Sequence, residues 1–114
     1  MVPSSVNCYG VLTDYVTEIV ASFGRSTAEV RIAMAAEGDY RFGISLSYSY
    51  GGIGSAPSTD DEAFATYAQA LDGGIAMLLR RWHTPLPSDP ASVHEELRIL
   101  REQLLARQRQ PSLF

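Results

Sequence analysis

A chain of 114 residues, of which 46% are hydrophobic and 19% charged, can bury one modest core and is too short for two independent domains. It has no apolar run of membrane-spanning length, and residues 1–7 lack the features of a secretory signal, so we expect a cytoplasmic protein with no membrane role. Its formal net charge of −4 arises in residues 1–79, where three arginines oppose nine acidic residues, and such an acidic body disfavours direct binding of nucleic acid.

The first periodic segment, residues 11–23, predicts an N-terminal helix. Gly24 follows where the left-handed cap of a helix would lie, and Asp14 and Glu18 suit the positive end of a helix dipole. The apolar residues recur at three- and four-residue steps, which is the spacing of one helical stripe. They are Val11, Leu12, Tyr15, Val16, Ile19, Val20 and Phe23.

From residue 28 the apolar period changes to two, which predicts an antiparallel β-hairpin or small sheet. Residues 28–34 and 40–50 alternate apolar side chains with polar or small ones, on either side of a glycine-containing turn. We expect Phe42, Ile44 and Leu46 to lie in the core. The opposite face of the second run is made of serine and glycine, and the sequence leaves open whether it is solvated or packed.

A second helix is predicted from residue 58 onward, packed on the sheet. Thr59 and Glu62 fit a capping box, and the acidic residues between them suit the first turn of a helix. The apolar stripe continues as far as Trp82. It crosses Gly73-Gly74, where we expect a weakness or a kink.

Residues 85–89 are rich in proline and predict a stiff linker between an acidic α+β domain, residues 1–84, and a C-terminal amphipathic helix, residues 90–110. Asp89 is the expected N-cap and Pro90 the first helical residue. This helix carries a narrow apolar seam that can dock on the body or pair with a second copy of the chain in a homodimer. The seam consists of Val93, Leu97, Leu100 and Leu104.

No pattern in the sequence indicates catalysis, a cofactor or a metal site, so we expect a protein that is not an enzyme. Gly51-Gly52-Ile53-Gly54 lacks the spacing and the lysine of phosphate-binding loops. Helix capping explains the acidic run Asp60-Asp61-Glu62 better than a calcium loop does. His83 and His94 have no further ligand at metal-binding spacing. Cys8, the single cysteine, excludes an internal disulfide, and we expect its thiol to be buried.

The chain ends in the motif Gln110-Pro111-Ser112-Leu113-Phe114. Pro111 must end the preceding helix, which leaves residues 111–114 as an extended peptide with two adjacent large apolar side chains. Such side chains should be covered, either by the body or by the groove of a partner. The motif resembles the Gln-x-x-Leu-Phe peptide by which bacterial replication and repair proteins bind the hydrophobic cleft of the sliding DNA clamp. Gln110, Ser112, Leu113 and Phe114 match that pattern, and Pro111 departs from it.

Three functions remain as hypotheses. The first is a non-enzymatic adaptor or regulator, of a kind related to phages or plasmids, whose tail engages the sliding clamp as the resemblance implies. The second is a small acidic inhibitor or immunity-type protein that masks a basic partner surface. The third is a small-ligand binder that uses a pocket between the hairpin and the second helix.

Overall fold

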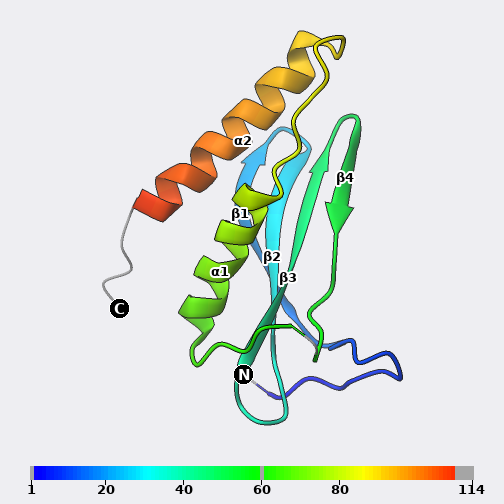
Figure 1. The fold of residues 1–114 in the computed structure, drawn as a ribbon, viewed down its shortest axis with the longest axis vertical. Helices are drawn as coiled ribbons and strands as arrows, with labels where there is room; N and C mark the ends of the chain where they lie inside the picture. Colours follow the sequence, from blue (N-terminus) through cyan, green and yellow to red (C-terminus); the bar gives the residue numbers. More distant parts are fainter. Residues whose placement is uncertain (1, 60, 110–114) are drawn as a thin grey trace.

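The computed structural model describes residues 2–59 and 61–109. Its strands form one antiparallel sheet in the order β1-β2-β3-β4, and both helices follow the sheet in the chain. The strands are Val16–Phe23 (β1), Ser26–Met34 (β2), Tyr40–Tyr48 (β3) and Gly51–Gly54 (β4), and the helices are Tyr67–Arg80 (α1) and Ala91–Arg109 (α2). Both helices cover the same face, α1 over β2 and β3 and α2 mainly over β1 (Figure 1). The α+β class expected from the sequence is therefore confirmed.

The predicted hairpin forms the centre of the sheet. β2 and β3 pair in one unbroken register, in which Val30 lies opposite Ile44 on the face toward the helices. Gly38, in the turn between these strands, has a φ of +90°, which glycine adopts without strain. The buried face of β3 ends before residue 50, where the predicted alternation of apolar residues ended. β3 stops at Tyr48, and Tyr50 is exposed in the turn that leads to β4.

The N-terminal helix predicted over residues 11–23 is wrong, because this segment leads into strand β1 at the edge of the sheet. A bulge between Ile19 and Ala21 explains the misleading pattern. Val20 and Ala21, which are neighbours in the sequence, are both buried, so the two-residue period is interrupted and the apolar spacing looks helical. Gly24 has a φ of +60°, but it serves the tight turn into β2 and not a helix cap.

Helix α1 begins later than the sequence predicted. The backbone N–H and C=O groups of Phe64 bond to those of Tyr40, at 2.9 and 2.8 Å, which holds this part of the chain extended beside β3. Thr66 is the N-cap, and its side chain accepts the N–H of Gln69 at 3.1 Å. Because Phe64 uses its backbone groups on the sheet, the helix can start only after it.

The glycine pair in α1 allows the helix to approach the sheet closely. The helix runs without a break through Gly73 and Gly74. A side-chain carbon at Gly74 would lie 2.8 Å from Cγ2 of Val30 and closer still to its Cγ1. Glycine is therefore required at this point by the contact between α1 and β2, whatever it costs in helix propensity.

The apolar seam of α2 is buried within the chain. Its four residues belong to the main core cluster, and the helix contacts chiefly β1, with α1 next. Of the two alternatives left open by the sequence, the structure has the seam docked on the body. The exposed fractions are 1% for Val93, 2% for Leu97, and 0% for Leu100 and Leu104. Asp89, the expected N-cap, instead accepts the backbone N–H of Leu86 at 2.8 Å in the loop before the helix.

Two polar side chains of α2 bind the sheet. Oε1 of Gln103 accepts the N–H of Ser22 at 3.0 Å, and Nε2 of Gln103 donates to the Ser22 carbonyl at 2.9 Å. Since Ser22 belongs to the edge strand β1, this amide takes the place of a neighbouring strand. Oε1 of Glu96 accepts the hydroxyl groups of Ser26 and Ser49, both at 2.6 Å. Glu96 thereby joins α2 to the turns at the ends of β2 and β3.

Replacing Glu96 with glutamine should lower the free energy of unfolding by about 1–2 kcal/mol at neutral pH, because two charge-assisted hydrogen bonds become neutral ones. The hydroxyls of Ser26 and then Ser49 hold the pKa of the Glu96 carboxyl below its ordinary value of 4.5, and burial opposes them less strongly. A lowered folded-state pKa means that this stabilisation is present above the unfolded-state pKa and is lost as the pH falls through the folded-state value.

Urea unfolding of wild type and Glu96→Gln across the acidic range provides the measurement. The difference in unfolding free energy should shrink as the pH falls below 4.5. Glu95→Gln, at the exposed neighbouring position, is the matched control and should show little effect at any pH. A difference for Glu96→Gln that does not change with pH would show that the charge contributes nothing.

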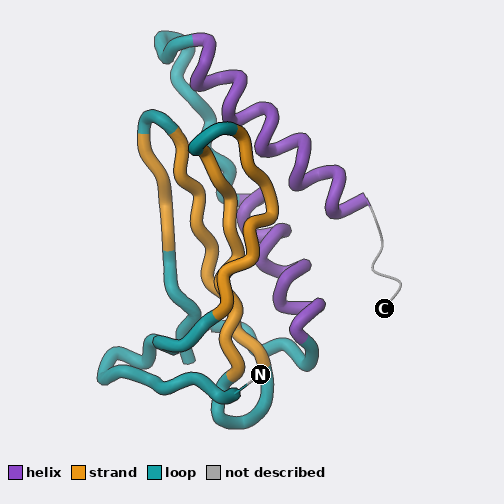
Figure 2. The backbone as a smooth tube through the Cα atoms, turned by 180° about the vertical axis from the view of Figure 1, so that it is seen from behind, coloured by secondary structure: helices purple, strands orange, loops and turns teal. Residues whose placement is uncertain are grey.

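No helix of the described residues covers the face of the sheet opposite α1 and α2 (Figure 2). A side-chain carbon at Gly43 would clash with the backbone carbonyl of Ser55, so the chain after β4 passes close to the backbone of β3 there. Gly43 and Ser45 are buried, whereas Ser47 is exposed. The serine and glycine face is thus packed at one end and solvated at the other. Among the described residues, no helix is long and apolar enough to cross a membrane.

Candidate functional site

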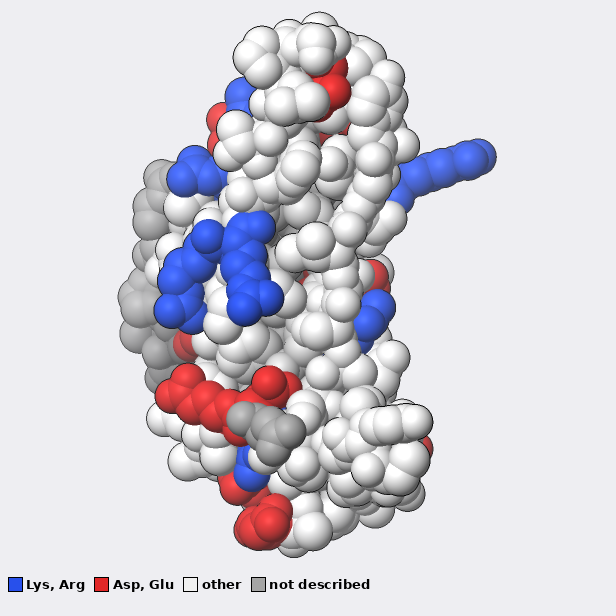
Figure 3. Space-filling model, turned by 45° about the vertical axis from the view of Figure 1, so that its right-hand side comes forward, with Lys and Arg blue, Asp and Glu red and all other residues white. Residues whose placement is uncertain are grey.

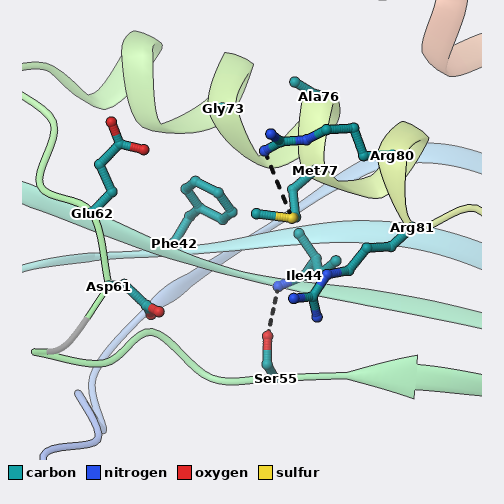
Figure 4. Close-up of a pocket in the computed structure, with 10 residues that line it drawn as sticks. All are labelled: Phe42, Ile44, Ser55, Asp61, Glu62, Gly73, Ala76, Met77, Arg80 and Arg81. Atoms are coloured by element: carbon teal, nitrogen blue, oxygen red, sulfur yellow. Dashed lines mark hydrogen bonds between the residues drawn. The ribbon is translucent and has the colours of Figure 1, made fainter.

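A cavity of about 390 Å³ lies between α1, β3 and the segment that joins β4 to α1. Figure 4 shows Phe42 and Ile44 of β3 on one side and Gly73, Ala76 and Met77 of α1 on the other. The two-residue period of β3 places Phe42 and Ile44 on the face toward the helices, and helical spacing places the three α1 residues above them. The volume lies in the range of small-molecule sites, and this part of the lining is apolar.

Gly73 makes room for the aromatic lining of this cavity. A side-chain carbon at Gly73 would lie 2.9 Å from Cζ of Phe64 and 3.1 Å from Cε2 of Phe42. The rings of Phe42 and Phe64 pack against each other with their centroids 5.6 Å apart. The absence of a side chain at Gly73 therefore lets this aromatic pair lie directly under the helix.

Two arginines stand at the C-terminal end of α1. Arg80 and Arg81 line the cavity, and both guanidinium groups extend over its apolar lining (Figure 4). A nitrogen of Arg80, Nη2, lies 3.8 Å from Sδ of Met77. Neither arginine forms an ion pair with another residue in the described ranges 2–59 and 61–109. The negative end of the helix dipole favours these cations, and their charges stay available to a ligand.

Asp61 and Glu62 line the other end of the cavity. The predicted capping box of Thr59 with Glu62, and the place of Asp61 in the first helical turn, are wrong, because α1 begins later and is capped by Thr66. Oδ2 of Asp61 instead accepts the backbone N–H of Ser58 at 2.8 Å, which orients the carboxylate. Glu62 is exposed and, among the described residues, forms no ion pair. The cavity is therefore basic at one end and acidic at the other.

The charges on this side of the molecule are separated into patches. Figure 3 shows a cluster of arginine atoms beside a band of carboxylates. The net charge of −4 gives no sign of this separation, because it averages over the whole chain. Positive and negative patches thus lie next to each other on this surface. A ligand that carries both charges can contact both patches at the same time.

A second and more open groove, of about 660 Å³, lies between the α1–α2 loop and α2. It is lined by both histidines together with Arg98 and Arg101. Nε2 of His94 lies 2.9 Å from the Leu86 carbonyl, and this contact folds the loop so that His83 and His94 border the same groove. The part of the chain that is described contains no group of three or more His, Cys, Asp or Glu side chains placed to hold a metal ion.

The residues that the sequence analysis named as candidate sites fall into two groups in the structure, those in the core and those outside the described residues. The α2 seam is core, whereas Asp60, Gln110, Ser112, Leu113 and Phe114 lie outside the described residues. Cys8 is exposed, so the prediction of a buried thiol is wrong. The sequence analysis did not predict that Arg80 and Arg81 line a cavity. The one sequence feature that could have indicated it is their position at the end of an apolar helical stripe. Comparison of the chain with protein-family models, with curated proteins and with solved structures gave no match.

Proposed function

We propose that the protein is a non-enzymatic adaptor or regulator that binds a bacterial sliding DNA clamp, a cytoplasmic partner, through residues 110–114. The observation that carries the proposal is the motif itself, in which Gln110 is followed by Ser112, Leu113 and Phe114. Two adjacent apolar side chains can fill a hydrophobic cleft, and the Gln110 amide can donate and accept hydrogen bonds at its edge.

The arrangement of α2 supports this proposal. The apolar seam is used in docking, and Leu104 is its last buried residue. Residues 106–108 are exposed, so the last described turn of the helix, which precedes the motif in the chain, does not pack on the core. The hydrogen bonds of Gln103 to β1 hold the helix on the body. A short peptide that follows such a helix can enter a cleft that the folded body cannot enter.

Leu113→Ala and Phe114→Ala should each weaken binding of the full chain to purified clamp by about 2 kcal/mol or more, roughly 30-fold, because such anchors concentrate binding energy in few side chains. Pro111→Leu should strengthen binding, since it restores an apolar second position. Isothermal titration with the full chain, beside a peptide of residues 105–114, provides the measurement. Leu86→Ala, at a leucine that is 63% exposed in the α1–α2 loop, is the matched control.

Clamp binding that survives the loss of both Leu113 and Phe114 would sink this proposal. The alternative is an inhibitor whose acidic body, residues 1–79, masks a basic partner surface. That mode of binding would weaken steeply as salt is added and would not depend on residues 110–114. The same titrations at low and high salt separate the two functions.

A further inference from the structure

We propose that the cavity under α1 binds a short apolar peptide with free termini, its carboxylate at Arg80 and Arg81 and its ammonium group at Asp61 and Glu62. The described lining of the cavity comes from residues 42–81, and the proposal does not depend on the proposed clamp binding. Four features of the cavity support it, namely the apolar lining, the two charged ends, the distance between them and a polar group along one side.

The lining of the cavity determines which side chains the middle of the ligand can carry. Phe42, Ile44 and Met77 present carbon and sulfur to a cavity of about 390 Å³, so the bound segment must be apolar to replace the water there. Ser55 supplies a polar group on the β4 side. Its oxygen accepts the N–H of Ile44 at 3.2 Å, and its hydroxyl hydrogen is available to a peptide carbonyl.

The charged ends select a ligand that carries both signs. A simple organic anion would meet Asp61 and Glu62, and a simple cation would meet Arg80 and Arg81. Arg41 lies near the acidic end, where Nη1 donates to the Asp61 carbonyl at 3.2 Å. Its guanidinium is already paired with Asp39, at 2.9 Å, so it leaves the acidic end negative. A ligand with a positive charge at one end and a negative charge at the other can pair with the acidic and the basic end of the cavity at the same time.

The distance along α1 sets the length of the ligand. Figure 4 shows Asp61 and Glu62 toward the Gly73 end of the cavity and the arginines at the other end. Gly73 and Arg80 are seven residues apart on the helix, about 10 Å, but Nη2 of Arg80 lies 3.8 Å from Sδ of Met77, so its charge lies over Met77, only four residues or about 6 Å from Gly73. An extended peptide advances by about 3.3–3.6 Å per residue, so a peptide of two or three residues covers a span of about 6 to 10 Å.

The test is an NMR titration of the ¹⁵N-labelled full chain with the tripeptide Ala-Phe-Leu, its N-acetyl form and its C-terminal amide. The free tripeptide should cause saturable shifts at the amides of Ser55, Gly73 and Met77. Each capped form should bind about fivefold more weakly, the upper range for one partly exposed ion pair. Absence of saturable shifts at these amides, or equal affinity for all three forms, overturns the proposal. So does a loss on amidation alone, which would indicate a site for organic anions.

Variants at each end give a sharper test. The double variant Arg80→Gln/Arg81→Gln should bind the free tripeptide about fivefold more weakly and should no longer distinguish it from the amide. Asp61→Asn/Glu62→Gln should instead lose the distinction between the free and the acetylated forms. Arg107→Gln, an exposed arginine on α2, removes a like charge and should leave both distinctions intact. Distinctions that persist in both double variants would place the binding elsewhere.

Ala76→Phe supplies a steric control, because Ala76 is a half-buried residue of the cavity lining. The added ring should reduce tripeptide binding at least tenfold while the dispersed spectrum of the folded chain is kept. Leu113→Ala should leave tripeptide binding unchanged, so failure of this site and failure of clamp binding can be told apart. Full tripeptide affinity in a folded Ala76→Phe protein would contradict the proposal.

Discussion

Leu100→Glu should unfold the protein at room temperature. Leu100 lies in the middle of the α2 seam and is 0% exposed. A carboxylate at this position must stay charged without a partner, bind a proton at a raised pKa, or push α2 away from the sheet, and each of these costs several kcal/mol. Since a domain of this size is stable by only about 5–15 kcal/mol, a loss of several kcal/mol is comparable to the whole free energy of unfolding. Circular dichroism and urea unfolding provide the measurement.

Two companion variants define the cause. Leu100→Ala removes buried carbon without adding charge and should cost about 2–5 kcal/mol. Gln108→Glu adds the same charge at an exposed position of the same helix and should change stability by less than about 0.5 kcal/mol. Sedimentation should give the same mass for wild type and Leu100→Ala, because the seam is covered within the chain. Conversion of a dimer to a monomer would show instead that a second copy covers it.

Gly74→Ala should destabilise the protein by about 1–3 kcal/mol, although alanine is the better helix former by about 1 kcal/mol. The added carbon would overlap Val30, whose branched side chain is 0% exposed at the centre of the sheet and has little freedom to rotate. Either the helix must rise from β2 or the strand must give way. Thermal or urea unfolding measures the change.

The neighbouring glycine offers a matched comparison. Gly73→Ala gains the same helix propensity, but its new carbon meets the outer atoms of the Phe64 and Phe42 rings, which can turn more easily than the branched carbon of Val30. We expect this variant to be near neutral. Val30→Ala in the Gly74→Ala background should return the missing space, so the double variant should be more stable than the sum of the single changes predicts. Strict additivity would show that the two residues do not compete for the same space.

The sequence predicts well those elements whose period is uninterrupted. The β2–β3 hairpin shows the same alternation over nearly its whole length, and no bulge disturbs the pairing of Val30 with Ile44. The α2 seam also keeps its spacing from Val93 to Leu104. In both cases one face of the element is buried and the other is mostly not. The apolar period therefore identifies both the type of element and its buried face.

Elements that are set by contacts between residues far apart in the sequence cannot be predicted from the local pattern. β1 reads as a helix because its bulge places Val20 and Ala21 together in the core. The start of α1 is set by the backbone pairing of Phe64 with Tyr40, which no local preference reveals. The same is true of the cavity, since the fold alone brings its acidic and basic ends to one side of α1.

The amide of Gln103 makes the cover of the β1 edge at Ser22 depend on a helix that is synthesised after the sheet. During synthesis the four strands leave the ribosome before α2 is complete, so the nascent sheet has its β1 edge open for a time. An open edge with unpaired N–H and C=O groups is a template for another chain. Only when α2 docks does Gln103 occupy the backbone of Ser22. The cover of this edge at Ser22 is thus acquired only when α2 docks and is lost when α2 detaches.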